Sequence, residues 1–272
     1  MVSINKQALI ATVHRNPIVK VVAIGVSGRE ASAQMIKEGI EGVSFAYYDK
    51  APVADESIMN DLRDAHLVIV MGAIDDATLF SRVGRISKGI NLLTIGMGIK
   101  GSEPCVLKAD LFDSLFLVST DQLANANQLQ ADFLNLACAG LARALLEEGR
   151  VVLDFRDVET VLTQNGSVAI GVGIGAGSDR ALDAVSAALA HPALVDLDPS
   201  IASATWIILK ANSRIPISEV RLAIDSFQCW AYAPDPFGHS ADSFGLYQLV
   251  EGGNFGDEIR ATVIVTGLPQ TN

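Results

Sequence analysis

One stretch of the sequence has the form of a phosphate-binding site, a buried strand followed by a short loop and a helix. It runs LVIVMGAIDDATLFSRVGRI over residues 67–86. A helix N-terminus attracts phosphate, because its first backbone N–H groups are unpaired and the helix dipole is positive there. The loop, however, carries Asp75 and Asp76, and two carboxylates would repel a phosphate group. The pattern therefore predicts the backbone geometry of a phosphate site, but with negative side chains where a phosphate group needs positive charge.

The first of two glycine-rich stretches, VVAIGVSGREASAQ, could open a dinucleotide site. Gly25 and Gly28 lie between a predicted strand and a predicted helix, and Asp49 ends the next strand, where an acid that binds ribose belongs. The spacing is G-x-x-G instead of G-x-G-x-x-G, and Glu30 would stand near the pyrophosphate. We therefore favour a structural interpretation, in which the glycines allow a positive φ or close helix packing.

The second glycine-rich stretch is AIGVGIGAGSDRALDAV. It contains G-x-G-x-x-A at Gly171, Gly173 and Ala176, with Asp196 further along the chain. A single fingerprint of this kind is a weak signal, and we favour the same structural interpretation for it.

Composition and scattered side chains exclude several classes of function. The 272 residues are 50% hydrophobic and carry a formal net charge of −11, which argues against binding to nucleic acid or directly to a membrane surface. The three cysteines and four histidines show no metal-ligand spacing, so we expect no metal site. The N-terminus lacks the pattern of a signal peptide, and no apolar run approaches the ~20 residues of a membrane span. We expect a cytoplasmic protein whose partner is another protein or a small molecule.

Apolar runs alternate with helical patterns along the first half of the chain. We expect strands at 19–25, 42–49, 67–72, 91–98 and 115–120, and helices at 29–40, 56–65 and 78–89. This alternation predicts an α/β fold with a doubly wound, Rossmann-like parallel sheet.

A long helix and then a different pattern follow. Apolar residues at intervals of three and four predict one helix from Asp121 to Glu148, with an apolar stripe wide enough to be covered from more than one side. Further on, we expect helices at 155–163, 178–192 and 216–228, strands at 167–175 and 205–211, and a closing strand pair at 243–252 and 257–267. The sequence predicts a Rossmann-like domain at 1–122, a central core helix at 123–149 and a smaller α+β C-terminal domain at 150–272.

The segment VVLDFRDVETVLTQNGSVAIGVGIGAGSDRALDAVSAALAHPALVD closely resembles FtsZ, the bacterial tubulin homologue, from its synergy loop into its C-terminal domain. The similarity extends to DEIRATVIVTG near the end and to VKVVAIG and IEGVSF near the start, so that it spans residues 18–267. The resemblance implies a divergent member of the FtsZ/tubulin superfamily. It further implies a GTP-binding N-terminal domain, a core helix and an activating C-terminal domain, stacked head to tail in filaments.

The main phosphate loop that this resemblance implies is degenerate. The family carries the run Gly-Gly-Gly-Thr-Gly-Thr-Gly where this chain has DDATLFS at 75–81, and Thr78 alone matches. The family's glycines let backbone N–H groups close on phosphate oxygens. We expect Leu79 and Phe80 to fill the space that those glycines leave open.

Other parts of the implied pocket depart from the family as well. The first loop keeps Gly25 and Gly28 but ends in Arg29 and Glu30 instead of further glycines and an asparagine. The segment 50–66 is too short for the family's extra phosphate-contacting loop. Asp132, on the core helix, aligns with an aspartate that reads guanine.

The synergy loop departs less from the family. Its pattern, Asn-x-Asp-x-x-Asp, positions water against the γ-phosphate held by the next subunit, and here it reads Val152, Asp154 and Asp157. Both acids also suit a helix start, with Asp154 as the N-cap of helix 155–163 and Asp157 in its first turn. We favour capping, and keep a catalytic role on a partner's nucleotide as the alternative.

Together these observations predict an FtsZ-like protein that has lost canonical GTP binding and hydrolysis. It would act as a cytoskeletal assembly or regulatory partner through head-to-tail contacts with itself or another FtsZ-like protein, and no cofactor is expected. Gly25, Gly28, Thr78 and Asp132 would then be remnants of a nucleotide pocket. The alternatives are an active family GTPase with altered loops, which would bind GTP or GDP, and a dinucleotide-dependent enzyme that uses the region 25–49.

Overall fold

Five parallel strands form the N-terminal half of the sheet. The structure, a computed structural model, describes residues 17–49, 53–74, 77–101, 107–125, 129–147, 153–164, 167–212, 215–232, 244–252 and 256–268. The five strands are β1 (Val19–Ile24), β2 (Val43–Tyr48), β3 (Leu67–Ala73), β4 (Leu93–Lys100) and β5 (Ser114–Ser119), in the order β2-β1-β3-β4-β5. Strands β3 and β4 are almost entirely buried, as parallel strands are when helices cover both faces of their sheet.

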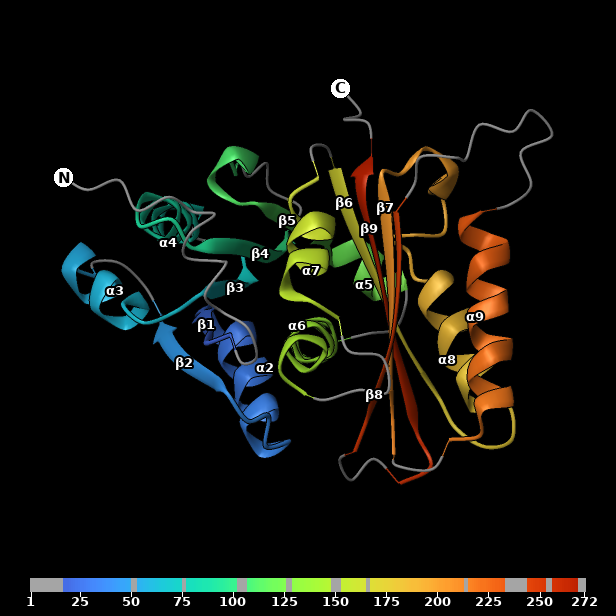
Figure 1. The fold of residues 1–272 in the computed structure, drawn as a ribbon. Coiled ribbons are helices and arrows are strands. Elements are labelled where there is room, and N and C mark those ends of the chain that lie inside the picture. The colour runs from blue at the N-terminus through green and yellow to red at the C-terminus, as the bar shows by residue number, and fades with distance from the viewer. Residues whose placement is uncertain are drawn as a thin grey trace.

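Helices cover both faces of this N-terminal half (Figure 1). Helix α2 (Gly25–Lys37) packs on one face, and α3 (Asp55–Leu62) and α4 (Ala77–Gly89) pack on the other. The alternation is visible within β1, where Val21 joins the core under α2 and Val22 joins the core under α3 and α4. Because α2 and α4 leave the adjacent strands β1 and β3 toward opposite faces, the topology switches direction between these two strands.

The central helix is shorter than the sequence predicts. A short helix, α5 (Thr120–Asn125), follows β5, and the core helix α6 spans Gln130–Leu146. Leu129 lies just before α6 in an extended conformation and is 72% exposed, so it cannot belong to the buried stripe that the pattern suggested. The prediction of one helix from Asp121 to Glu148 is therefore wrong, because the chain leaves the helical conformation before Gln130.

Four strands form the C-terminal half of the sheet, in the order β6-β9-β7-β8. They are β6 (Ser167–Gly175), β7 (Ala204–Ala211), β8 (Phe244–Glu251) and β9 (Ile259–Leu268), and a single residue pair, Phe116 with Val168, joins β6 to β5. Strand β9 is antiparallel to both β6 and β7, and β8 is parallel to β7. The predicted closing pair of the last two strands is wrong, because β7 inserts between β8 and β9.

The core helix lies between the two halves of the sheet. Figure 1 shows α6 and α7 (Phe155–Leu162) on one face of the C-terminal half, and α8 (Arg180–Leu189) and α9 (Ile217–Ala231) on the other. In agreement, Trp206 and Ile208 of β7 join the core around α6, whereas Ile207 and Leu209 pack with α8 and α9. Helix α6 also contacts α2, β3 and β4, which explains why most of its residues are buried.

The predicted α/β fold is confirmed, with a parallel Rossmann-like sheet, a core helix and a second, mixed part. Two 3-10 turns, η1 (Ala109–Leu111) and η2 (Pro199–Ile201), complete the described elements. The division into domains at 1–122, 123–149 and 150–272 stays a prediction. Within the described ranges, no helix combines the length and apolar character that crossing a membrane requires.

Candidate functional site

The switch point between β1 and β3 is where a doubly wound sheet binds ligands, outside the carboxyl ends of the strands. Helix α2 begins there at Gly25, directly after the last residue of β1. Gly25 has a φ of +69°, which a residue without a Cβ adopts at little cost. The stretch GVSGRE, expected as a loop before a helix at 29, is therefore the first turns of α2 itself.

The first turn of α2 packs directly against the end of β3. The Ser27 hydroxyl accepts a hydrogen bond from the Ala73 backbone N–H at 3.2 Å, and Ser27 is 9% exposed. A Cβ at Gly28 would lie 2.7 Å from the Met71 carbonyl oxygen, and one at Gly72 would lie 2.2 Å from that of Ile24. Such distances are far shorter than van der Waals contact, so glycine is required here for close packing of helix and strands. This supports the structural interpretation of Gly28.

An ion pair lies beside the first turns of α2. The Arg29 guanidinium donates to the Asp49 carboxylate, and the two side chains are 56% and 62% exposed. Asp49 is the acid that the dinucleotide alternative assigned to ribose, and in this structure it is engaged by Arg29. Next to it, burial and a hydrogen bond to Asp61 raise the pKa of Tyr48.

The main phosphate loop that the resemblance implies, residues 75–81, leads into α4. Asp75 and Asp76 lie outside the described residues, and Thr78 is exposed in the first turn of α4. Leu79 and Phe80 are fully buried in the core between α4 and the sheet, where the Phe80 ring lies 5.6 Å from that of Phe112. Our expectation that these two side chains fill a ligand space is wrong, because the helical turn directs both of them into the core.

Asp132 lies in the first turn of the core helix and faces α2. Its carboxylate accepts a hydrogen bond from the Gln34 side-chain amide at 3.0 Å. Helix α2 thus carries both glycines of the first loop and holds Asp132, whereas Thr78 belongs to α4, which covers the opposite face of the sheet. Sequence reasoning missed Gln34 and Ser27. A polar side chain at an inward position of the predicted helix 29–40 was a signal that could have identified Gln34. Ser27 precedes that predicted helix and gave no such signal.

The second glycine-rich stretch forms strand β6 and not a phosphate-binding turn. If Gly171, Gly173 and Gly175 each carried a Cβ, these atoms would lie 2.2, 2.2 and 2.0 Å from backbone carbonyl oxygens of α8. The alternate glycines let the backbone of α8 approach the sheet closely, on the side where its alanines are buried. The spacing G-x-G-x-x-A that ends at Ala176 is therefore a packing pattern, as the structural interpretation expected.

The two acids of the synergy-loop pattern lie at the start of α7. Asp154 is the N-cap, and its carboxylate accepts a hydrogen bond from the Arg156 backbone N–H at 3.1 Å. Asp154 is exposed, and Asp157, in the first turn, is partly exposed. Val152 lies outside the described residues.

The far end of α7 is tied to both halves of the sheet. Its last carbonyl groups accept hydrogen bonds from the hydroxyls of Ser114 on β5 and Thr266 on β9. The helix that presents Asp154 is thus fixed relative to both halves. Within the described ranges, no group of three His, Cys, Asp or Glu side chains could hold a metal ion.

The sequence is similar to known FtsZ proteins along most of its length, although no protein-family model matches the chain. It is 22% identical to cell division protein FtsZ of Buchnera aphidicola subsp. Baizongia pistaciae, over 95% of this chain and 81% of the relative. It is 25% identical to cell division protein FtsZ of Coxiella burnetii, over 93% of this chain and 80% of the relative. The Buchnera match extends over 322 residues against 272 in this chain, so the relative has at least 50 residues in that region that this chain lacks.

Solved structures share the fold. A mutant FtsZ of M. jannaschii superposes with a TM-score of 0.77 at 20% identity, covering 96% of this chain and 93% of that one. CetZ2 from Haloferax volcanii, in a GTPγS-bound protofilament, gives a TM-score of 0.62 at 15% identity, with coverage of 93% and 94%. The sequence similarity to FtsZ extends over more than nine tenths of the chain, and FtsZ and CetZ2 share its fold, so the comparisons support membership of the FtsZ/tubulin superfamily at low identity.

Proposed function

We propose that this protein is an FtsZ-like assembly or regulatory partner in the cytoplasm that neither binds nor hydrolyses GTP and needs no cofactor. One observation carries the proposal. The first turn of α2 packs on the end of β3 through Ser27 and Gly28, at the switch point where a nucleotide would enter a doubly wound sheet. Because α2 begins at Gly25, directly after β1 ends at Ile24, no loop remains between strand and helix to close around phosphate groups.

The charges around this point support the same proposal. Asp75 and Asp76 follow β3 in sequence, and each carboxylate would repel a phosphate charge at about 4 Å by roughly 1–4 kcal/mol with intermediate screening. Arg29, the cation of the first turns of α2, pairs with Asp49. The net charge of −11 adds a general repulsion toward a polyphosphate.

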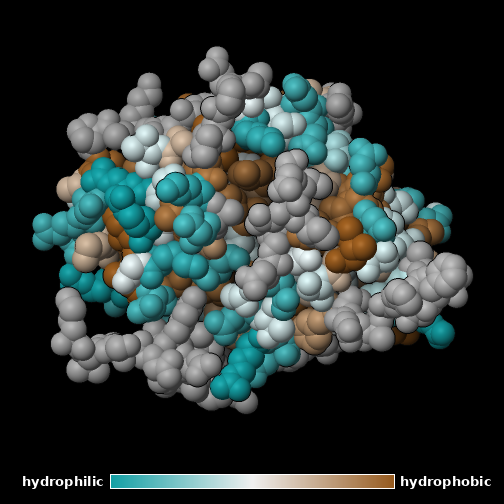
Figure 2. All heavy atoms as spheres, turned by 90° about the horizontal axis from the view of Figure 1, so that it is seen from above, coloured by the Kyte–Doolittle hydropathy of each residue, from teal (hydrophilic) through white to brown (hydrophobic). Residues whose placement is uncertain are grey.

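Exposed apolar side chains at the starts of α2 and α6 support a protein contact in place of a nucleotide. Val26, in the first turn of α2, and Leu129, directly before α6, are 74% and 72% exposed, more than any other large apolar side chain in the described ranges. Figure 2 shows apolar side chains among hydrophilic ones on the face seen from above. Exposed apolar groups with polar surroundings are typical of surfaces that bind other proteins.

The two acids at the start of α7 suggest how this protein could act on a partner. In head-to-tail stacking, the synergy loop of one subunit meets the nucleotide of the next, so a chain without its own pocket can still present carboxylates to a partner's pocket. Asp154 and Asp157 lie at a helix start that is fixed to both halves of the sheet. We propose that they act on a partner's nucleotide, or remain as helix caps while the protein ends a filament.

The second candidate function is retained binding of GTP or GDP. One observation favours it, because Asp132 lies in the first turn of the core helix beside α2 and is partly exposed. Its carboxylate already accepts from Gln34, and one base contact contributes little without a site for the phosphates. We therefore rank it second.

The proposal is tested by mixing the protein with an FtsZ-like GTPase from the same cell and measuring GTP turnover and polymer mass. The informative variants are Asp154→Asn and Asp157→Asn. Asparagine caps helices as well as aspartate does, so Asp154→Asn removes the charge and keeps the fold. Asp198→Asn is the matched control, because Asp198 caps η2 in the same way, accepting from the Ser200 backbone N–H at 3.0 Å.

Each outcome has a defined meaning. Altered turnover that is lost in the two α7 variants and kept in Asp198→Asn supports a donated catalytic site. Altered polymer mass that survives all three variants supports capping by shape alone. If the wild-type protein changes neither quantity and does not co-sediment with the GTPase at micromolar concentration, the proposed partnership is wrong for that pair.

A further inference from the structure

Two cations lie directly opposite each other on neighbouring strands of the C-terminal half. Lys210 on β7 pairs in register with Arg260 on β9, and the Lys210 side chain is only 4% exposed. Like charges at directly opposite positions destabilise a sheet, and burial disfavours the charged form of an amine. Accordingly, burial lowers the pKa of Lys210, and the contact with Glu147 opposes that shift. These two positions require carboxylates nearby.

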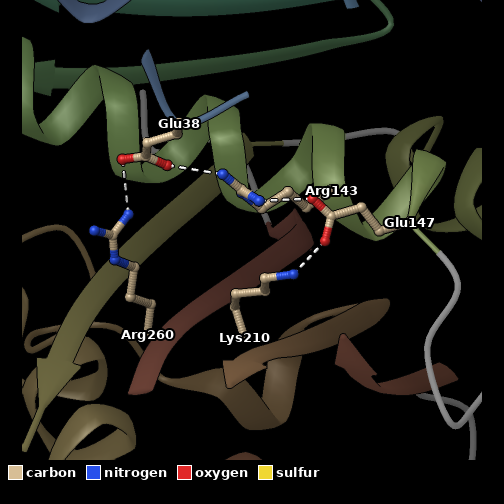
Figure 3. A network of polar contacts seen from close by, with 5 residues as sticks. All are labelled: Glu38, Arg143, Glu147, Lys210 and Arg260. Atoms are coloured by element: carbon tan, nitrogen blue, oxygen red, sulfur yellow. Dashed lines mark hydrogen bonds and ion pairs between the residues drawn. The ribbon is translucent and has the colours of Figure 1, made fainter. Parts of the chain in front are cut away.

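The carboxylates come from outside the C-terminal half. Lys210 donates to Glu147, the C-cap residue of α6, and Arg260 donates to Glu38, the C-cap residue of α2, at 2.9 Å. Arg143 of α6 lies between the two acids and donates to Glu38 at 2.9 Å and to Glu147 at 2.6 Å. Figure 3 shows the five side chains as one continuous chain of contacts from β9 through α2 and α6 to β7.

The arrangement is complementary in charge across the boundary between the halves. The β7 and β9 strands contribute two cations, and the ends of α2 and α6 contribute two carboxylates, with the guanidinium of Arg143 between them. Arg143 is 5% exposed, while Glu38 and Glu147 are 21% and 23% exposed. Burial weakens solvent screening, so each contact is stronger than a surface ion pair, and loss of one partner leaves a poorly solvated charge.

We propose that Glu38, Arg143, Glu147, Lys210 and Arg260 form an ionic latch that fixes the orientation of the C-terminal half relative to α2 and α6. The main-chain connection between the halves is weak, because β5 and β6 share one residue pair in the described part of the sheet. Rotation of the C-terminal half about α6 would separate Arg260 from Glu38 or Lys210 from Glu147. The latch therefore opposes that rotation directly.

The latch is tested by measuring the distance between the halves with two spin labels. One label is placed on Cys229, an exposed cysteine on α9, and the other on Ser57→Cys, at an exposed position of α3. Cys105 is replaced by serine, and Cys138 is buried and does not need replacement. Pulsed electron-spin resonance then gives the distribution of distances between α3 and α9 in the wild-type and Lys210→Met backgrounds.

The expected result is one narrow distance peak in the wild-type background and a broadened or shifted distribution in Lys210→Met. Lys88→Met is the control. Lys88 of α4 pairs with Asp113 at 3.0 Å, the Asp113 side chain is 8% exposed, and both residues lie within the N-terminal half on elements that carry no label, so the distance distribution should stay as in the wild type. An unchanged distribution in Lys210→Met would overturn the proposal.

A milder variant keeps the test decisive if Lys210→Met does not fold. Glu38→Gln preserves the shape of the side chain and removes one charge from the contacts of both Arg143 and Arg260. Its distance distribution should broaden in the same direction, and 1 M salt should broaden it further, because the exposed edges of the latch are then screened. A Glu38→Gln distance distribution that matches the wild type both without added salt and in 1 M salt contradicts the latch.

Discussion

Substituting Gly173 by alanine tests whether the glycines of β6 serve packing or ligand binding. A Cβ at this position would lie 2.2 Å from the Ala184 carbonyl oxygen, 2.5 Å from the Ala188 backbone nitrogen and 2.9 Å from the Ala187 Cβ. Optimal contacts between such atoms are about 3.5–4.0 Å, so α8 must move away by roughly 1 Å or more. The obstacle is helix backbone, which cannot rotate aside as a flexible side chain can.

The cost of this displacement follows from known overpacked cores. Adding atoms to a well-packed interior destabilises a protein by about 1–3 kcal/mol, occasionally more, and we expect about 3 kcal/mol for Gly173→Ala because two of the three contacts are with main-chain atoms. Urea unfolding followed by circular dichroism gives this value from the midpoint, provided that the m-value is unchanged. Gly89→Ala is the control, because Gly89 ends α4 with nothing within 4 Å of the new Cβ. Equal stability of the two variants would refute the packing interpretation.

Three further predictions concern pH, capping and assembly. Burial lowers the pKa of His191 from 6.5 to about 4, so the neutral ring, stacked on Phe133 and accepting from the Ala193 N–H, contributes stability above pH 6.5 that is lost as pH falls toward 4. This amounts to about 3 kcal/mol. Urea unfolding at a series of pH values should lose this step in His191→Gln, and a step of equal size in that variant would contradict the assignment. Asp154→Ala should destabilise the fold by about 1 kcal/mol and Asp154→Ser by much less, as thermal unfolding of the two variants will reveal, and equal losses would argue against capping. Sedimentation should be the same with and without GTP, because on the proposed function no nucleotide binds that could shift an assembly equilibrium, and a GTP-dependent pellet is the opposing result.

The alternation of strands and helices could be predicted from the sequence because it follows from local pattern. Runs such as VKVVAIG and LVIVMG are buried on both faces of a parallel sheet, and their continuous apolar character indicates this directly. The N-cap role of Asp154 was equally local, because an acid directly before an apolar helical pattern favours capping. Each of these inferences needed information from only a few neighbouring residues.

What the sequence did not reveal depends on contacts between distant segments. Gly25 and Gly28 suggest a loop because glycine is common in loops, whereas here they allow α2 to start at once and to approach Met71. The insertion of β7 between β8 and β9 is a choice of strand partner, and strand patterns alone do not encode it. Alignment with the family puts Leu79 and Phe80 at a ligand site, although the turn of α4 directs them into the core.

The ionic latch left a trace in the sequence that could have been used. Lys210 interrupts the apolar strand pattern TWIILKA one residue before its end, and Arg143 interrupts the apolar helix LACAGLARALL. A charge within a pattern of buried residues indicates a buried ion pair, because an unpaired charge would be too costly there. Its partners could not be predicted, since Glu38 lies 105 residues before Arg143 and 222 before Arg260.

The central claim is that this chain has no working nucleotide site, and equilibrium titration with a fluorescent GTP analogue tests it most directly. Purified protein, shown to be folded by circular dichroism, is added at concentrations up to tens of micromolar while fluorescence anisotropy is followed. On the proposed function, in which α2 follows β1 without a loop and Asp75 and Asp76 follow β3, we predict no saturable increase and no effect of competing GTP or GDP. Saturable binding with micromolar affinity that unlabelled GTP displaces would contradict the claim.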